Sequence, residues 1–176
     1  MTDAGLLRVQ VLCEDSEHEA FARRVFERWH GVGRRRVKVT KAPQGKGAAS
    51  QWVTEQLADL ARKVRANRHQ QRLIFLAVTD GDNLGFSGRK EQLESNAPRE
   101  PGDRLAIWAP TWSIETWVLW LSQTQVKDRP VDEHQSFKTA LPAARFRELL
   151  DDAVEAWNSP HPGEADSIPS LTDARG

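Results

Sequence analysis

Short apolar runs alternate with amphipathic stretches along most of the chain. Strands are predicted over residues 6–13, 35–42, 73–80 and 105–110. Apolar residues recur at helical spacing in the intervening and following segments, and helices are predicted over residues 16–30, 49–68, 87–95, 112–122 and 142–157. Because strands that alternate with helices pair in parallel through crossover connections, we expect a three-layer α/β fold. It has a mainly parallel four-stranded sheet with helices on both faces.

Two of the predicted strands differ in their pattern. The segment LIFLAVTD at 73–80 is the most hydrophobic run and predicts a central, buried strand. The segment RRVKVTKA at 35–42 alternates valine with basic residues, which is typical of an edge strand. The order of the strands in the sheet is thereby partly predicted.

The domain organisation follows from where the pattern stops. Residues 1–157 show one continuous series of elements without an internal repeat, so we expect a single domain. Residues 158–176 contain Pro and Gly, few large apolar residues and no period, so we expect a loose tail.

Acidic residues follow the first and third predicted strands. Glu14 comes directly after strand 6–13, and Asp80-Gly81-Asp82 ends strand 73–80. Carboxyl ends of parallel strands meet at one edge of a sheet, so Glu14, Asp80 and Asp82 are expected to converge, with Gly81 letting both aspartates face one ion. Close carboxylates repel unless a cation lies between them, and oxygen ligands favour Mg²⁺ or Mn²⁺.

Acidic residues after strands also have an ordinary structural role, because they form turns and cap helices. We expect that role for Asp15. Ser16, with Glu19 three residues on, forms an S-x-x-E pattern that predicts the N-cap of helix 16–30.

Other acidic and glycine-rich motifs fit the chain less well. The run from Asp80 to Glu91 is close to a calcium-binding EF-hand loop, but Leu84 stands at its fifth position and a strand precedes it. Aspartate-nucleophile phosphatases carry D-x-D after the first strand, whereas here it follows the third. Nucleotide-sugar transferases with D-x-D are longer. Segment 43–50 lacks the Walker spacing of an ATPase.

Composition excludes several classes of protein. The chain has 25 basic and 25 acidic residues, so its net charge of zero does not indicate a nucleic acid or a membrane as partner. The absence of tyrosine excludes chemistry through a tyrosyl intermediate. Cys13 is the one cysteine and is expected to be a buried structural thiol. No apolar run approaches the ~20 residues of a membrane-spanning helix and no signal peptide is evident, so we expect a cytoplasmic protein without membrane contact.

Four further polar residues are candidates with two interpretations each. Glu115 either faces solvent near the start of its helix or completes the acidic cluster. Lys46, which lies between two glycines, either has a function, by contacting a phosphate or taking part in the chemistry, or is a solvated turn residue. Lys138 has the same two interpretations. His18 is a ligand or general base, or an ordinary surface residue of its helix, which we favour.

Basic residues gather in two segments. The first cluster, expected to bind nucleic acid, consists of Arg34, Arg35, Arg36, Lys38 and Lys41. The second consists of Arg62, Lys63, Arg65, Arg68 and Arg72. Such runs are commonly solvated faces. On a neutral chain, two clusters near the acidic end of the sheet would also offer a track for phosphates.

Three motifs in order carry a family resemblance. Glu after the first strand, a following helix and D-x-D after the third strand resemble the TOPRIM fold of topoisomerases, bacterial primases and nucleases of the overcoming-lysogenization-defect family. VLCEDSEHEAF resembles the V-E-G-x-x-E-x-x-F of small TOPRIM-like proteins from phage-defence loci, and PTWSIETWVLWL resembles their P-x-x-x-I-E-x-W. Together the motifs span about residues 6–138.

The resemblance implies a TOPRIM-like, Mg²⁺-dependent nuclease that cleaves DNA or RNA phosphodiesters in antiviral defence, beside an ATPase partner. The implied catalytic residues are Glu14, Asp80, Asp82, Glu115 and Lys46, with the metal on Glu14, Asp80 and Asp82. The chain departs from the family pattern by having Asp15 in place of a glycine and His18 in place of a second acidic residue.

Two other functions stay open. The main alternative is a catalytically weak or inactive TOPRIM-like subunit that binds a partner protein or nucleic acid. The other is a metal-dependent phosphotransferase that acts on nucleotides. Homo-oligomerisation is left open as well.

Overall fold

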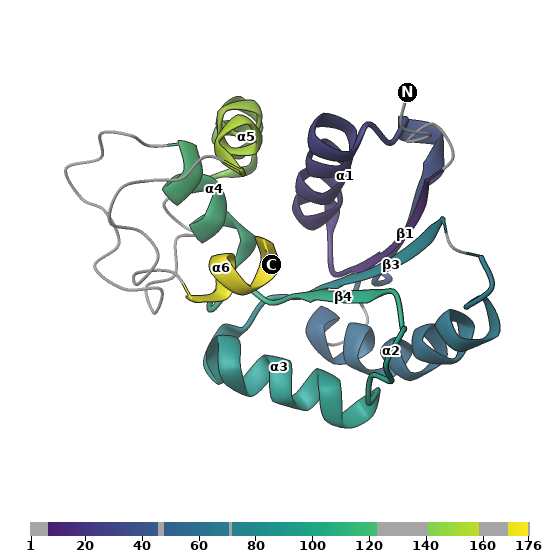
Figure 1. Ribbon diagram of the computed structural model, residues 1–176. Helices are drawn as coiled ribbons and strands as arrows, with labels where there is room; N and C mark the ends of the chain where they lie inside the picture. Colours follow the sequence, from purple (N-terminus) through teal and green to yellow (C-terminus); the bar gives the residue numbers. More distant parts are fainter. Residues whose placement is uncertain (1–6, 46–47, 71, 123–140, 159–168, 176) are drawn as a thin grey trace.

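The computed structural model describes residues 7–45, 48–70, 72–122, 141–158 and 169–175. Its strands are β1 (Arg8–Cys13), β2 (Val37–Lys41), β3 (Leu73–Val78) and β4 (Leu105–Trp108). They form one sheet in the order β2-β1-β3-β4, and all three pairings are parallel (Figure 1). The expected α/β fold with a parallel four-stranded sheet is confirmed, as are the edge position of β2 and the central position of β3.

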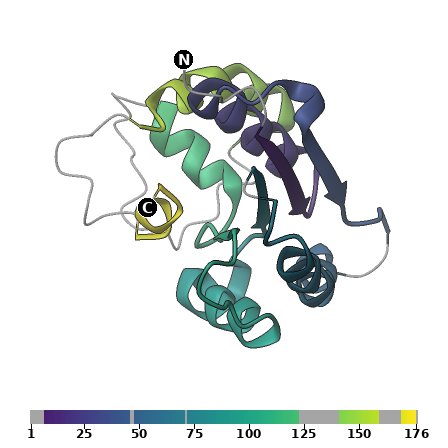
Figure 2. The same cartoon turned by 45° about the vertical axis from the view of Figure 1, so that its right-hand side comes forward.

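Helices cover both faces of this sheet. They are α1 (Ser16–His30), α2 (Ala49–Ala66), α3 (Gly85–Asn96), α4 (Ile114–Ser122), α5 (Ala143–Ala156) and α6 (Pro169–Arg175), with 3₁₀ turns η2 (Arg34–Arg36) and η3 (Asp82–Leu84). Helices α1, α4 and α5 lie on one side of the sheet and α2 and α3 on the other (Figures 1 and 2). No helix in these described ranges has both the length and the apolarity needed to cross a membrane.

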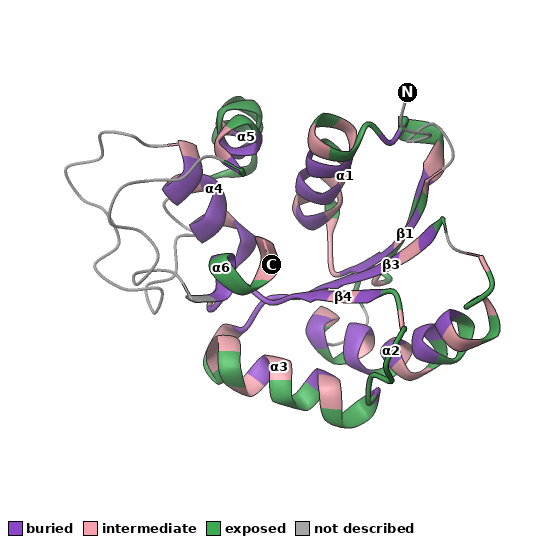
Figure 3. Cartoon of the chain, in the orientation of Figure 1, coloured by how far each residue is buried: buried purple, intermediate pink, exposed green. Residues whose placement is uncertain are grey.

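Each face of the sheet has its own core, because successive strand residues point to opposite sides. On the α1 side the core is aromatic: Phe21, Trp108, Trp117 and Trp157 pack with ring centroids 5.1 to 6.3 Å apart. On the α2 side it is largely aliphatic, as with Leu57. Strands β1, β3 and β4 are largely buried between these two layers (Figure 3), whereas in the edge strand β2 only Val37 is buried. Each fully buried large side chain stabilises the fold by about 1.5–3 kcal/mol.

The strand register determines what meets at the carboxyl edge of the sheet. Cys13 pairs with Lys41 on one side and with Val78 on the other, and Val78 pairs with Trp108. The residues that follow these positions therefore leave the sheet at the same edge. This edge is where the acidic residues were expected.

Helix α1 begins at Ser16 as predicted, but its N-cap is not the Ser16 that the S-x-x-E pattern indicated, and the turn or cap role expected for Asp15 is confirmed. Asp15, not Ser16, is the N-cap: its Oδ1 accepts hydrogen bonds from the backbone N–H groups of Glu17 and His18 at 3.0 and 3.1 Å. Ser16 is exposed, and its hydroxyl donates a hydrogen bond to the carboxylate of Glu17. Both residue types cap helices well, but an aspartate also adds a negative charge at the positive end of the helix dipole.

The described end of the tail is a helix. Residues 169–175 form α6, in which Leu171 is 3% exposed and Ser170 is 1% exposed. The Ser170 hydroxyl accepts a hydrogen bond from Trp117 Nε1 at 3.0 Å. The prediction of a loose tail is wrong for this segment because two residues suffice to attach a short helix to an existing core, without any period in the sequence.

Candidate metal centre

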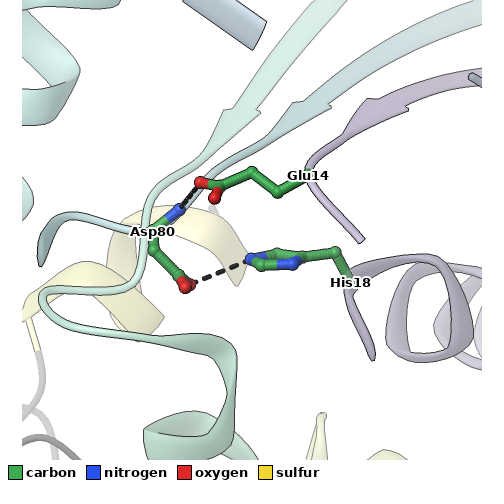
Figure 4. A group of neighbouring side chains, drawn as sticks. All are labelled: Glu14, His18 and Asp80. Carbon is green, nitrogen blue, oxygen red and sulfur yellow. Dashed lines mark hydrogen bonds and ion pairs between the residues drawn. The ribbon is translucent and has the colours of Figure 1, made fainter. Parts of the chain in front are cut away.

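Glu14 links the ends of β1 and β3. Its Oε1 accepts a hydrogen bond from the backbone N–H of Asp80 at 2.7 Å (Figure 4). The same oxygen accepts another from the hydroxyl of Thr79. Parallel pairing of β1 with β3 brings this glutamate beside a residue 66 positions away. The convergence of Glu14 and Asp80 predicted from the strand ends is therefore observed.

Asp80 is fully buried where β3 leaves the sheet. Its Oδ1 accepts a hydrogen bond from the backbone N–H of Ile114, the first residue of α4, at 3.0 Å. The same oxygen lies 2.9 Å from His18 Nε2. One carboxylate thus joins the end of a strand, the start of one helix and a side chain of another.

His18 is the third member of the site, and the expectation of a surface residue is wrong. Its side chain is 0% exposed, and its Nδ1 lies 2.7 Å from Asp15 Oδ1. Its Nε2 faces Asp80 (Figure 4). The signal was in the sequence: His18 stands three, four and seven positions before Phe21, Ala22 and Val25, which places it on the buried stripe of α1. A polar residue on an apolar stripe needs a buried partner, and Asp80 supplies it.

The charges of this group shift one another. Burial by itself lowers the pKa of His18, but the charge of Asp80 and hydrogen bonds with Asp15 and Asp80 outweigh it, so the pKa lies well above 6.5. Burial raises the pKa of Asp15, but the side-chain hydrogen bond with His18, the charge of His18 and the backbone N–H groups of His18 and Glu17 together outweigh burial and lower the pKa to about 2. Burial and the charge of Asp80 raise the pKa of Glu14 above its usual 4.5.

The side chains of Glu14, His18 and Asp80 form a group that could hold a metal ion. One ligand atom from each lies within 4.8 Å of the others. The 2.9 Å between His18 Nε2 and Asp80 Oδ1 matches the roughly 3 Å between neighbouring ligands of a six-coordinate ion. Asp15, by accepting from Nδ1–H, would leave Nε2 as the metal-binding atom, the arrangement that orients many metal-bound histidines.

This set of ligands changes the expected cation. Two carboxylates and an imidazole suit Mn²⁺ or Zn²⁺ better than Mg²⁺, which prefers oxygen ligands and water. A cation at Nε2 also requires that nitrogen to be deprotonated. The imidazolium form of His18 and a bound cation are therefore alternatives at the same place.

Asp82 does not join the three ligands, although the D-x-D pattern predicted that it would. It lies in η3 with a positive φ of 46°, and its side chain is 45% exposed and 3.7 Å from Arg89 Nη2. Gly81 also differs from the expectation, because its φ of −71° suits any residue. Glycine is needed there for space: a Cβ would lie 2.1 Å from the carbonyl oxygen of Thr111.

The remaining predicted residues are placed as follows. Glu115 lies half-buried in the first turn of α4 and is not among the three clustered ligands that the described residues provide. Lys46 and Lys138 lie outside the described residues. Cys13 is fully buried, as predicted, and burial together with the charges of Asp15 and Glu19 raises the pKa of its thiol to about 12.

The first basic cluster spans the length of β2 instead of gathering at the acidic edge. Arg34–Arg36 precede β2, so they stand at the opposite end of the sheet, roughly 16 Å from Lys41 at 3.3 Å per residue. Lys41 alone lies at the carboxyl edge, 2.8 Å from Glu19. A recess along β2 is lined by Arg34, Arg35 and Lys38 together with Glu19 and Arg23.

The second basic cluster is partly neutralised within the fold. Arg65 lies 3.1 Å from Glu100, and Arg68 lies 2.6 Å from Glu100 and 2.9 Å from Asp103. These arginines fasten the end of α2 to the loop before β4. The structure thus gives Arg65 and Arg68 a role inside the fold.

Comparisons with protein-family models, with curated proteins and with solved structures find nothing that matches the chain. The family resemblance accordingly rests on the three sequence motifs alone.

Proposed function

We propose that the protein is a metal-dependent nuclease that cleaves nucleic-acid phosphodiesters, with its cation held by Glu14, His18 and Asp80. The observation that supports this most is the meeting of three ligand atoms within 4.8 Å at the carboxyl ends of β1 and β3. Ligand and substrate sites of parallel α/β sheets lie at this edge. The family resemblance implies Mg²⁺ or Mn²⁺, and of these two the imidazole ligand favours Mn²⁺, which is the proposed cation.

The proposed roles follow from the contacts. A bound divalent cation would polarise a phosphoryl oxygen of the substrate and activate a water molecule for attack. Glu14 and Asp80 contribute negative oxygen ligands, and Asp15 orients His18 through Nδ1. The backbone N–H of Ile114 holds the Asp80 carboxylate in place.

The proposed substrate follows from the charge along β2. Arg34, Arg35 and Lys38 are exposed beside the edge strand, and Lys41 continues the series to the end next to Glu14. The roughly 16 Å from Arg36 to Lys41 corresponds to about five phosphates at 3.4 Å per step, with Lys41 at one end paired to Glu19. A phage-defence setting and an ATPase partner are proposed from the resemblance to small TOPRIM-like proteins alone.

A second candidate is supported by the protonation of His18. With its pKa well above 6.5, His18 carries the positive charge that two aspartates need, without any cation. A chain with such a self-neutralised centre would be a catalytically weak or inactive subunit that binds a partner protein or nucleic acid.

One experiment separates these candidates. Mn²⁺ and Mg²⁺ binding is measured by calorimetry, and cleavage of a plasmid and of a structured RNA is followed, for wild type, Asp80→Asn and His18→Gln. Asp82→Asn, two positions away, is the matched control. We expect Mn²⁺ binding and cleavage in wild type and in the control, and loss of both in the other two variants.

The other outcomes are equally informative. A wild type that binds no Mn²⁺ would overturn the nuclease proposal and leave the inactive subunit. Binding without cleavage of either nucleic acid would support the metal centre and favour an activity that depends on a partner.

A further inference from the structure

Arg89 is a buried cation directly behind the candidate metal centre. Its side chain, on α3, is 7% exposed. Its Nε donates a hydrogen bond to the backbone carbonyl of Asp80 at 2.8 Å, and its Nη1 donates to Gln92 Oε1 at 2.7 Å. Its Nη2 lies 3.7 Å from Asp82 Oδ2. One guanidinium thus contacts both aspartates of the D-x-D segment, one by its backbone and the other by its side chain.

The segment held by Arg89 is also fastened to the loop that leads into α4. The Gly81 N–H donates to the Pro110 carbonyl at 2.8 Å, and the Asp82 N–H donates to the Trp112 carbonyl at 3.2 Å. Asp82 adopts a φ of 46°, in the left-handed region that aspartate enters more readily than most residues other than glycine. The turn over Asp80–Asp82 is therefore held from two sides, by Arg89 and by the loop before α4.

Burying a guanidinium is costly unless its donors are satisfied by fixed partners. The partners of Arg89 that lie outside its own helix are the Asp80 carbonyl and the Asp82 carboxylate. Lysine has no planar fork and could not make both contacts in these directions. The identity of the residue, and not only its charge, fits the task of holding this turn.

We infer that Arg89 is the positioning residue of the candidate metal centre. It fixes the Asp80–Asp82 turn so that the Asp80 carboxylate faces His18, and it keeps the Asp82 carboxylate out of the cluster. The inference about the turn stands on geometry alone, whereas its consequence for the cation rests on the proposed function.

The test uses the full chain and three variants: Arg89→Lys, Arg89→Ala, and Arg99→Lys as the matched control. Arg99 is 40% exposed and lies 2.5 Å from Glu94, away from the D-x-D turn. Amide hydrogen exchange is measured at Gly81 and Asp82 and, as a reference, in the buried strands at Val11 and Leu76. Mn²⁺ affinity is measured by calorimetry, with and without millimolar guanidinium.

For Arg89→Lys we expect faster exchange at Gly81 and Asp82 with unchanged exchange in the strands, and a Mn²⁺ affinity lower by about tenfold. Guanidinium should restore the affinity of Arg89→Ala and leave that of wild type unchanged. Arg99→Lys should match wild type in both readouts.

Two results would overturn the inference. The first is unchanged exchange at Gly81 and Asp82 in Arg89→Lys; the second is a wild-type Mn²⁺ affinity in that variant. If wild type itself binds no Mn²⁺, the proposed function fails, and the exchange at Gly81 and Asp82 then decides by itself whether Arg89 holds the turn. An Arg89→Ala chain that does not fold leaves the decision to Arg89→Lys.

Discussion

Asp80 and Asp82 stand two positions apart in one turn, yet their surroundings are opposite. Asp80 is buried, and its carboxylate accepts a hydrogen bond from the backbone N–H of Ile114 and faces the buried His18. Asp82 is half-exposed, and its Oδ2 lies 3.7 Å from Nη2 of the buried Arg89. The D-x-D pattern alone does not bring two carboxylates to one ion. The turn between them and the partner opposite each carboxylate decide where each side chain goes.

The largest expected effect concerns Asp80. Replacing it in Asp80→Asn removes the charge opposite a fully buried His18, and breaking a buried charge pair in this way costs about 3 kcal/mol of unfolding free energy. Urea denaturation of the variant and of wild type measures this loss. A cost no larger than that of Asp82→Asn would erase the contrast between the two aspartates.

The residue between the aspartates comes next. Gly81→Ala places a Cβ 2.1 Å from the backbone oxygen of Thr111, so the turn or the loop before α4 must move. We expect a loss of about 2 kcal/mol, by the usual cost of overpacking. Gly33→Ala is the matched control, because its Cβ meets nothing within 4 Å and its φ is −58°. Equal urea midpoints for both alanine variants would contradict the close approach.

A smaller effect is expected on the other side of His18. Asp15→Asn keeps a good helix cap but removes the charge that faces Nδ1, and for a half-exposed carboxylate we expect a loss of about 1 kcal/mol. The loss should depend on pH, and thermal or urea unfolding of both proteins across the pH range measures it.

The sign of that dependence follows from the two pKa shifts. Asp15, with its pKa lowered from 3.8 to about 2, stabilises the fold above pH 3.8, and this is lost as the pH falls through about 2. His18, with its pKa raised, stabilises it below pH 6.5, and this is lost as the pH rises through the folded-state pKa. The difference between wild type and Asp15→Asn should therefore be largest near about pH 5. A difference that does not vary with pH would contradict the charged pair.

The smallest effect is expected for Asp82. Asparagine tolerates the positive φ at this position as well as aspartate does, and a half-exposed ion pair at 3.7 Å contributes little. Asp82→Asn should change the unfolding free energy by less than about 0.5 kcal/mol in urea. A larger loss would mean that Asp82 stabilises the turn as strongly as Asp80 does.

Much of the fold was predictable because it follows from periodicity. Helix α1 has the bounds expected from its apolar stripe, and the alternation in β2 and the continuous apolar run of β3 predicted an edge and a centre. Helix α6 was not predictable, because tertiary contacts of Ser170 and Leu171 with the existing core stabilise it. Propensity and pattern contain no record of such contacts.

The candidate site was predictable in part for a related reason. The strand ends predicted that Glu14 and Asp80 meet, since parallel pairing alone brings them together. The helical spacing places His18 on the apolar stripe of α1, but the sequence analysis expected it at the surface because most histidines on helices are exposed. Asp82 and Arg89 depend on one backbone angle and one buried cation, and neither leaves a periodic signal.

The distance along the chain between Glu14 and Asp80 has a consequence for how the protein is made. The two residues are 66 positions apart and are joined through β1–β3 pairing, while the amide that holds the Asp80 carboxylate belongs to Ile114. Pairings of such high contact order form late and slowly in folding. During synthesis, the centre cannot exist until the chain has grown past the start of α4. An unfinished or truncated chain therefore carries Glu14 and Asp80 without bringing them together, and the onset of the proposed Mn²⁺ binding would mark the completion of this arrangement.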